Sequence, residues 1–148
     1  QARDFAQRTG IAVNVHTNQD DLALDLERSI AIFRIFQEAL TNVFKHAQAT
    51  QVDVDLFADD NTLSLEVRDN GIGLSSDALR KQTSFGLRGM MERVHDLGGW
   101  MDISGSPTTG TPPFRGTTLM ISIPLNPQEA PMNSNGSKHP HHEPEDLE

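Results

Sequence analysis

The stretch EALTNVFKHA, residues 38–47, decides how the chain folds, because it lies near the end of a long helical pattern that begins around Ser29. At 3.6 residues per turn, one face of this helix gathers three polar side chains, namely Glu38, Asn42 and Lys45. The apolar residues gather broadly opposite: Ile32, Phe36, Leu40, Val43 and Ala47. The pattern therefore predicts a helix with one face against the core and the other free for chemistry.

The polar face combines groups of different chemistry. The carboxylate of Glu38 can accept a proton or orient a nucleophile, and the amide oxygen of Asn42 can ligate a hard cation such as Mg²⁺. The ammonium group of Lys45, one turn on, can meet phosphate. Glu38 and Asn42 are four residues apart, so their side chains are neighbours. Taken alone, however, these residues are better explained as a solvated helix face.

Length and composition limit the classes of function. The 148 residues suffice for one domain with a real core, and 36% hydrophobic with 22% charged residues is typical of a globular chain. A formal net charge of −9 argues against a nucleic-acid partner, which needs clustered Lys and Arg. The absence of cysteine excludes disulfides, thiolate catalysis and cysteine-ligated zinc. No membrane span or signal peptide is visible, and because the chain starts at Gln1 we expect a fragment of a longer protein.

Alternating residues predict strands on both sides of the long helix. Residues 3–9 look like the end of a helix that Gly10 stops, and residues 11–16 then alternate as a strand does. Residues 51–57 and 63–68 also alternate, and the four residues between them have the composition of a tight turn. These two segments predict an antiparallel hairpin with one buried face.

The second half of the chain adds a helix and another pair of strands. A helical pattern runs through residues 91–97 and stops at Gly98 and Gly99. Residues 100–104 and 117–123 alternate in the manner of strands. The chain is therefore expected to mix helices with a largely antiparallel sheet.

Two glycine-containing segments accompany these elements. Residues 69–74, DNGIGL, follow directly on a strand, and glycines two apart let the backbone approach a ligand closely. The carboxylate of Asp69 at the strand end is free to accept hydrogen bonds. Residues 86–90, GLRGM, place glycines at the start of a helix, where exposed amides can meet phosphate oxygens. Taken alone, the first segment is better described as a turn and the second as a loop that caps a helix.

Together and in this order, the three segments resemble the asparagine box and the two glycine boxes of the catalytic, ATP-binding domain of bacterial two-component sensor histidine kinases, within the GHKL superfamily. The Lys-His-Ala ending of residues 45–47 and a short lid at residues 74–85 are most similar to the nitrate-sensor and membrane-fluidity-sensor kinases. The resemblance spans residues 10–125. It implies an α+β fold of the Bergerat type: a two-layer α/β sandwich in which a mixed, mostly antiparallel sheet is covered on one face by about three helices, with a flexible ATP lid.

The resemblance also implies catalytic roles. Glu38 would be the polarising base near the γ-phosphate of ATP, Asn42 would offer its amide oxygen to Mg²⁺, and Lys45 would contact phosphate. Each role suits the chemistry of the residue type.

Further residues would bind the nucleotide. Asp69 would accept a hydrogen bond from the adenine amino group, and Gly71 and Gly73 would leave room for the base. The other contacts implied by the resemblance are His46 beside adenine or ribose, Gly86 and Gly89 with their amides on phosphates, Arg88 with an added positive charge, and Thr117 in the adenine pocket.

Two regions lie outside the family pattern. Where the family has a brief proline-glycine turn before its last strand, this chain has the longer segment 106–115, to which the resemblance assigns no role. Residues 126–148 are rich in Pro, Asn, Ser, His and acidic residues, so we expect a catalytic domain at 1–125 and a disordered tail at 126–148. The tail residues His139, His141 and His142 are expected to bind metal only adventitiously.

The resemblance implies a protein histidine kinase fragment that binds ATP or ADP with Mg²⁺. Nothing in the chain resembles the Glu/Asp-flanked phosphoacceptor histidine of the family. We therefore expect the full-length kinase to transfer the γ-phosphoryl group to a histidine on its separate dimerisation domain, which passes it to a response regulator. The isolated domain is expected to be monomeric and cytoplasmic, either as a free protein or as the cytoplasmic part of a membrane-bound sensor.

Two other functions remain open at this point. The same pocket could serve a nucleotide-binding module that transfers nothing. It could also belong to another ATPase of the superfamily, such as an anti-sigma serine kinase.

Overall fold

The computed structural model describes residues 1–18, 23–73, 86–106 and 116–125. The predicted lid at 74–85, the predicted tail at 126–148 and most of the segment 106–115 lie outside these ranges. The elements in chain order are α1 (Ala2–Thr9), β1 (Ala12–Thr17), α2 (Leu26–Asn42), the π-helix η1 (Val43–Ala47), β2 (Gln51–Ala58), β3 (Thr62–Asp69), α4 (Gly86–Asp96), β4 (Trp100–Ser106) and β5 (Gly116–Pro124).

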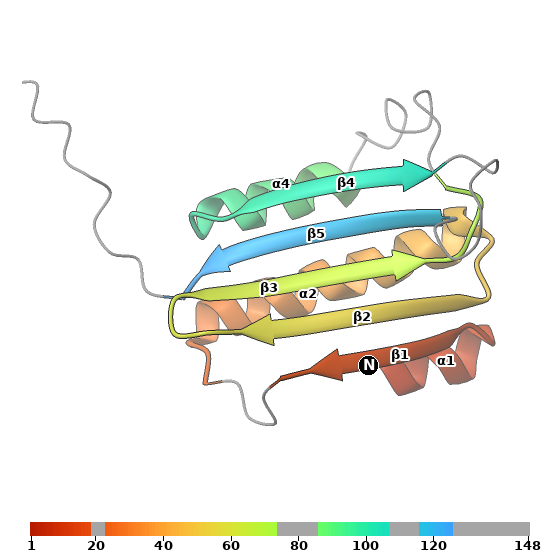
Figure 1. The fold of residues 1–148 in the computed structure, drawn as a ribbon, viewed down its shortest axis with the longest axis horizontal. Coiled ribbons are helices and arrows are strands. Elements are labelled where there is room, and N and C mark those ends of the chain that lie inside the picture. The colour runs from red at the N-terminus through yellow and green to blue at the C-terminus, as the bar shows by residue number, and fades with distance from the viewer. Residues whose placement is uncertain (19–22, 74–85, 107–115, 126–148) are drawn as a thin grey trace, which may run out of the picture.

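The strands form one five-stranded sheet in the order β1-β2-β3-β5-β4. β1 runs parallel to β2, and the other neighbouring strands are antiparallel. The helices α1, α2 and α4 lie on one face of this sheet (Figure 1). Their buried side chains meet those of the strands in a single core. The predicted two-layer α/β sandwich with a mixed, mostly antiparallel sheet is confirmed.

The helix α2 begins at Leu26, three residues before the predicted start at Ser29. Asp25 caps it, since a side-chain oxygen of Asp25 accepts a hydrogen bond from the backbone N–H of Arg28 at 2.8 Å. The Nε of Arg28 donates to the carbonyl oxygen of Pro124 at 3.0 Å, which ties the start of α2 to the end of β5. This capping signal consists of one residue, and the sequence pattern did not predict it.

The core face of α2 also differs from the predicted stripe. Its deepest residues are Ile35, with none of its surface exposed, Leu40, with 3% exposed, and Ala39, with 4% exposed, and of these only Leu40 belongs to the predicted stripe. Ile32 and Phe36, which were predicted to face the core, are only partly buried. The helix presents a broad stripe to a broad sheet, so the 3.6-residue period alone did not identify the centre of the stripe.

The predicted hairpin is confirmed. β2 and β3 pair in antiparallel register with Val54 opposite Val67 and Leu56 opposite Leu65. The turn is closed by Asp59, whose Oδ1 accepts hydrogen bonds from two backbone N–H groups, those of Asn61 and Thr62. The strands predicted at 11–16, 100–104 and 117–123, and the helices predicted at 3–9 and 91–97, are also present with ends shifted by a few residues.

Replacing Ile35 with alanine is expected to lower the free energy of unfolding by about 2–5 kcal/mol, because it opens a cavity where α2 meets the sheet. Urea unfolding followed by circular dichroism measures the change. Phe33→Ala is the matched control on the same helix, since 44% of Phe33 is exposed. Equal losses in both variants would mean that α2 packs through a different face.

Candidate functional site

A cavity of about 230 Å³ lies among α2, η1, α4 and the sheet. It is lined by Ala39, Asn42, Val43, His46, Ala47, Val67, Asp69, Ile72, Gly73, Leu87, Met90, Ile103, Thr117 and Leu119. Of the residues predicted from sequence, the cavity thus brings together Asn42, His46, Asp69, Gly73 and Thr117. Its volume suits one ring system better than a whole nucleotide, because sites for drug-sized ligands measure about 300–1,000 Å³.

Asp69 is the buried polar group of this cavity. It ends β3, and only 8% of its surface is exposed. Its Oδ1 accepts hydrogen bonds from the backbone N–H of Gly71 at 2.9 Å and of Thr117 at 3.2 Å. Both bonds go to Oδ1, so among the described residues Oδ2 stays available to accept a hydrogen bond from a ligand.

Burial raises the pKa of Asp69, and the hydrogen bonds from the backbone N–H groups of Gly71 and Thr117 only partly oppose this effect. The carboxylate is therefore incompletely solvated in its charged form. A ligand that donates a hydrogen bond to it would replace part of the missing solvation.

Gly71 lets the turn after β3 pack directly against η1. A Cβ at this position would lie 2.0 Å from the carbonyl oxygen of Ala47, which no side chain can tolerate. The same carbonyl oxygen accepts a hydrogen bond from the backbone N–H of Ile72 at 2.8 Å. Gly71 thus does not line the cavity but fixes the wall that Ala47 and Ile72 contribute to it.

The predicted polar face of the long helix is divided in the structure. Asn42 lines the 230 Å³ cavity, whereas Lys45 is exposed and lines neither of the two cavities described here. The division has a local cause, because residues 43–47 form a π-helix and no longer follow the 3.6-residue period. A π-turn of this kind is frequent at functional sites.

Glu38 lines a second and larger cavity, of about 860 Å³, among α1, α2 and α4. No other site residue predicted from the sequence is among the described residues that line it. Glu38 also lies against the start of α4, since a Cβ at Gly86 would come within 2.2 Å of its Oε1. The carboxylate therefore stands next to the exposed amides of the first turn of α4 but does not line the base-sized cavity.

Arg88 and Gly89 lie in the first turn of α4 but do not line the base-sized cavity. The Nε of Arg88 donates to Oε1 of Glu92 at 3.0 Å, so its charge is already paired with a neighbour on the same helix. The predicted contact of Arg88 with phosphate would therefore have to replace this exposed ion pair.

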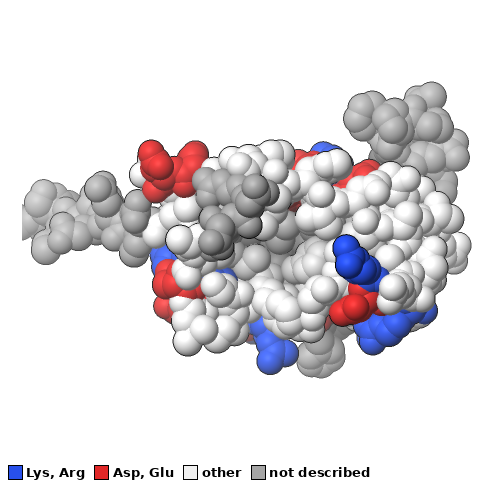
Figure 2. Space-filling view, turned by 90° about the horizontal axis from the view of Figure 1, so that it is seen from below, with Lys and Arg blue, Asp and Glu red and all other residues white. Residues whose placement is uncertain are grey.

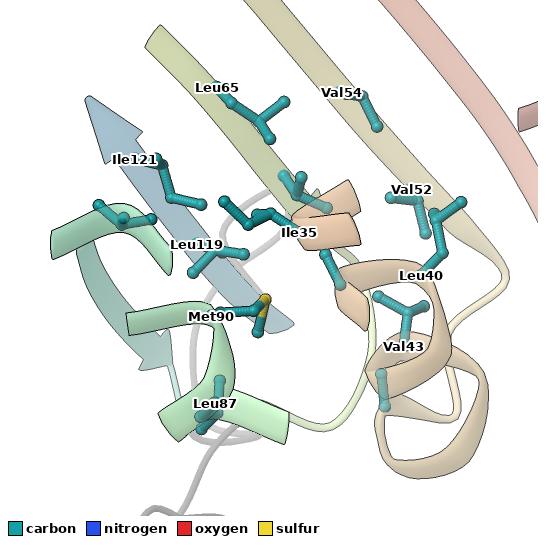
Figure 3. Close-up of a cluster of buried hydrophobic side chains, with 14 of the residues drawn as sticks. Ile35, Leu40, Val43, Val52, Val54, Leu65, Leu87, Met90, Leu119 and Ile121 are labelled. Atoms are coloured by element: carbon teal, nitrogen blue, oxygen red, sulfur yellow. The ribbon is translucent and has the colours of Figure 1, made fainter. Parts of the chain in front are cut away.

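The apolar walls of the cavity were missed by the sequence analysis. Leu87 and Met90 from α4 approach Val43 of η1 and Leu119 of β5 (Figure 3). Their only sequence signal is the periodicity that also marks ordinary core residues. They line the cavity because the fold places them next to the asparagine and glycine segments. This proximity in space cannot be predicted from the sequence alone.

The sequence profile of the family described as histidine kinase-, DNA gyrase B-, and HSP90-like ATPase matches residues 27–127. This match covers more than half of the chain. The chain belongs to this ATPase family. The matched range includes the three segments 38–47, 69–74 and 86–90, each of which contributes residues to the cavity.

Curated relatives confirm the resemblance of this ATPase domain to sensor histidine kinases. The chain is 34% identical over 123 residues to the oxygen sensor histidine kinase NreB of Staphylococcus carnosus, which covers 83% of this chain and 34% of NreB. It is 37% identical over 127 residues to the signal transduction histidine-protein kinase/phosphatase DegS of Brevibacillus brevis, which covers 86% of this chain and 31% of DegS. The chain spans about a third of the length of these relatives.

Solved histidine kinases share the fold of the ATPase domain. The histidine kinase domain of a blue-light activated histidine kinase from Erythrobacter litoralis superposes with a TM-score of 0.65 at 26% identity, covering 84% of this chain and 57% of that chain. The catalytic domain of the histidine kinase ThkA gives a TM-score of 0.67 at 16% identity, covering 85% and 87%. Within the described residues, no helix of the ATPase domain is long and apolar enough to cross a bilayer.

Replacing Asp69 with asparagine tests the burial of its charge. The variant keeps an oxygen that can accept from both N–H groups and removes the ionisable carboxyl. In the native protein, the stability that protonated Asp69 contributes is complete below the pKa of the unfolded chain and is lost as pH rises through the higher folded pKa. We therefore expect Asp69→Asn to match the native protein at acid pH and to become relatively more stable as pH rises to neutrality.

The measurement is urea unfolding across pH values from about 3 to 7, with Asp102→Asn as a control for the loss of one exposed carboxylate. A stability difference between Asp69→Asn and the native protein that stays constant with pH would contradict the burial of this charge.

Proposed function

We propose that the cavity binds the adenine base of ATP. The observation that carries this proposal is the buried carboxylate of Asp69, with Oδ1 held by two backbone N–H groups and Oδ2 available among the described residues. The exocyclic amino group of adenine would donate to Oδ2. The flat faces of the base would contact the apolar walls around Ile72, Met90 and Leu119.

The triphosphate would leave this cavity toward Asn42 and the first turn of α4. Gly86 opens that helix, and amides at a helix start favour anionic groups. The proposed contacts of Lys45 and His46 are supported by their position in η1, directly after Asn42. Gly89 and Arg88 follow Gly86 in the same turn, where a bound phosphate would offer Arg88 an alternative to Glu92.

The donor set suits a magnesium ion that arrives with the nucleotide. Among the described residues, no group of three or more His, Cys, Asp or Glu side chains could hold a metal alone. Mg²⁺ usually keeps several waters and binds through one or two protein oxygens together with substrate phosphates. The amide oxygen of Asn42 would be such a ligand, and the ion would supply neutralisation of the phosphate charge.

We further propose that the full-length protein transfers the γ-phosphoryl group to a histidine on a separate dimerisation domain, within a cytoplasmic two-component pathway. The position of Glu38 supports this, because it lines the larger cavity and not the cavity that would hold the base. An acceptor histidine could approach Glu38 through the larger cavity without entering the adenine cavity. Glu38 would then receive or orient the proton of the attacking imidazole.

Asn42→Ala tests the proposed magnesium ligand. Isothermal titration calorimetry with ATP is expected to show that the native chain loses at least tenfold in affinity when Mg²⁺ is chelated, about 1.4 kcal/mol. The variant should have the same weak affinity with and without Mg²⁺. The comparison variant Asp69→Asn should lose about tenfold or more under both conditions, because it removes the acceptor for the base. Native-like magnesium dependence in Asn42→Ala would remove Asn42 from the metal site.

Glu38→Gln separates binding from transfer. Added to the separately produced histidine-bearing domain and labelled ATP, the variant is expected to transfer phosphoryl groups about 10²–10⁴ times more slowly than the native chain, with unchanged ATP affinity. Thr41→Ala, which alters another residue lining the larger cavity, is the matched control. If the native chain binds ATP but never labels the histidine domain, the protein is a nucleotide-binding module or phosphorylates a different acceptor.

A further inference from the structure

The face of the sheet opposite the helices is not covered by any of the described elements (Figure 1). One row of paired residues crosses four strands of this face, from Phe57 on β2 through Ser64 and Ser122 to Trp100 on β4. Two aromatic side chains therefore stand on either side of two small serines. A shallow hollow of about 90 Å³ lies over this row.

The apolar side chains around the hollow are partly exposed to solvent. Trp100 is 55% exposed, Phe57 is 46% exposed and Met120, in the neighbouring row, is 42% exposed. Single exposed apolar residues are common, but three gathered on one surface indicate an interaction site. Aromatic residues and Met are also the types enriched at protein interfaces.

The surroundings of this apolar group are acidic. The neighbouring row places Asp55, Glu66, Met120 and Asp102 side by side across the same four strands. Arg68 forms ion pairs with Asp55 and Glu66, so those two carboxylates share a single positive charge. Asp102 is exposed and has no ion-pair partner among the described residues.

The distribution of charge over the molecule points the same way. Of the Lys and Arg side chains visible in the edge view of Figure 2, most lie toward the side that carries the helices. The open face of the sheet therefore keeps a negative character within a chain whose formal net charge is −9.

This combination excludes several occupants on electrostatic grounds. A second copy of the chain would bring one acidic row against another, which opposes association. A nucleic acid or an anionic bilayer would be repelled for the same reason. A segment with apolar side chains flanked by Lys or Arg would instead fit, because its cations could pair with Asp102 and Glu66 and stack on the ring of Trp100.

We propose that the open face around Trp100, Phe57 and Met120 is a docking surface for a basic, amphipathic segment of another protein. It lies on the opposite side of the sheet from the cavity that contains Asp69. Docking there is therefore independent of the nucleotide, and the proposal does not rest on the function proposed above.

Trp100 is the only tryptophan of the chain, so its fluorescence reports directly on this face. The probe is an 18-residue amphipathic helical peptide made of leucine and lysine, and the comparison peptide carries glutamate in place of lysine. Titrating the full chain with the lysine peptide is expected to shift the Trp100 emission to shorter wavelength and to saturate, and added salt should weaken the binding. The glutamate peptide should give no saturable change.

Charge and shape variants locate the contact. Asp102→Lys and Met120→Lys, both on the open face, are expected to weaken peptide binding at least fivefold. Asp96→Lys on α4 is the matched control for Asp102→Lys, because it makes the same change of charge on the helix side. It should leave the peptide affinity unchanged. ADP titrations run in parallel keep the two proposals separate, since a chain that binds no ADP can still bind the peptide through Trp100.

Four results would overturn the proposal. The first is equal binding of the glutamate peptide, and the second is an equal loss of affinity in Asp96→Lys. The third is a dimer in sedimentation experiments that already shields Trp100. The fourth is a change in Trp100 emission, without peptide, when residues 126–148 are removed. The third result would assign the face to a second copy and the fourth to the chain's own C-terminal segment.

Discussion

The geometry of the candidate site depends on one carboxylate held between two backbone N–H groups. Oδ1 of Asp69 accepts from Gly71, two residues further along the chain, and from Thr117 at the start of β5. Burying a carboxylate is costly unless it accepts hydrogen bonds, so the burial of Asp69 depends on both segments staying in place. The residue thereby joins the end of β3, the following turn and β5 at one corner of the cavity. The remaining features of the site are arranged around this corner.

The second wall is fixed by the backbone of η1. The carbonyl oxygen of Ala47 accepts from Ile72, and Gly71 brings the turn so close to it that a larger residue would push η1 away. The π-turn at residues 43–47 directs Val43, His46 and Ala47 to the cavity while Lys45 remains in solvent. The asparagine segment and the first glycine segment are therefore one structural unit, although 21 or more residues separate them in the sequence.

Sequence reasoning succeeded where a pattern is repeated and failed where one local interaction decides. The hairpin of β2 and β3 was predictable because alternation extends over two whole strands and Asp59 marks the turn. The start of α2 depends on the single cap Asp25, and the exposure of Lys45 depends on a π-turn that no periodicity announces. Arg88 was predicted to add positive charge near phosphate, and in the structure its Nε donates to Glu92 on the same helix. The motifs predicted which segments lie close together. They did not predict which cavity each polar side chain of this helical region lines, and only the structure shows this.

The separation of Glu38 from Asp69 has a consequence for how a reaction could proceed. Asp69 lines the base-sized cavity, whereas Glu38 lines the larger cavity and lies next to Gly86. A nucleotide with its base against Asp69 must therefore extend past Asn42 before its terminal phosphate can meet Glu38. Under the proposed roles of Asp69 and Glu38, adenine recognition and proton handling would then lie at opposite ends of one bound nucleotide. In the proposed function, this arrangement would hold the base while the reacting end stayed open to an acceptor from outside, as the proposed transfer to another domain requires.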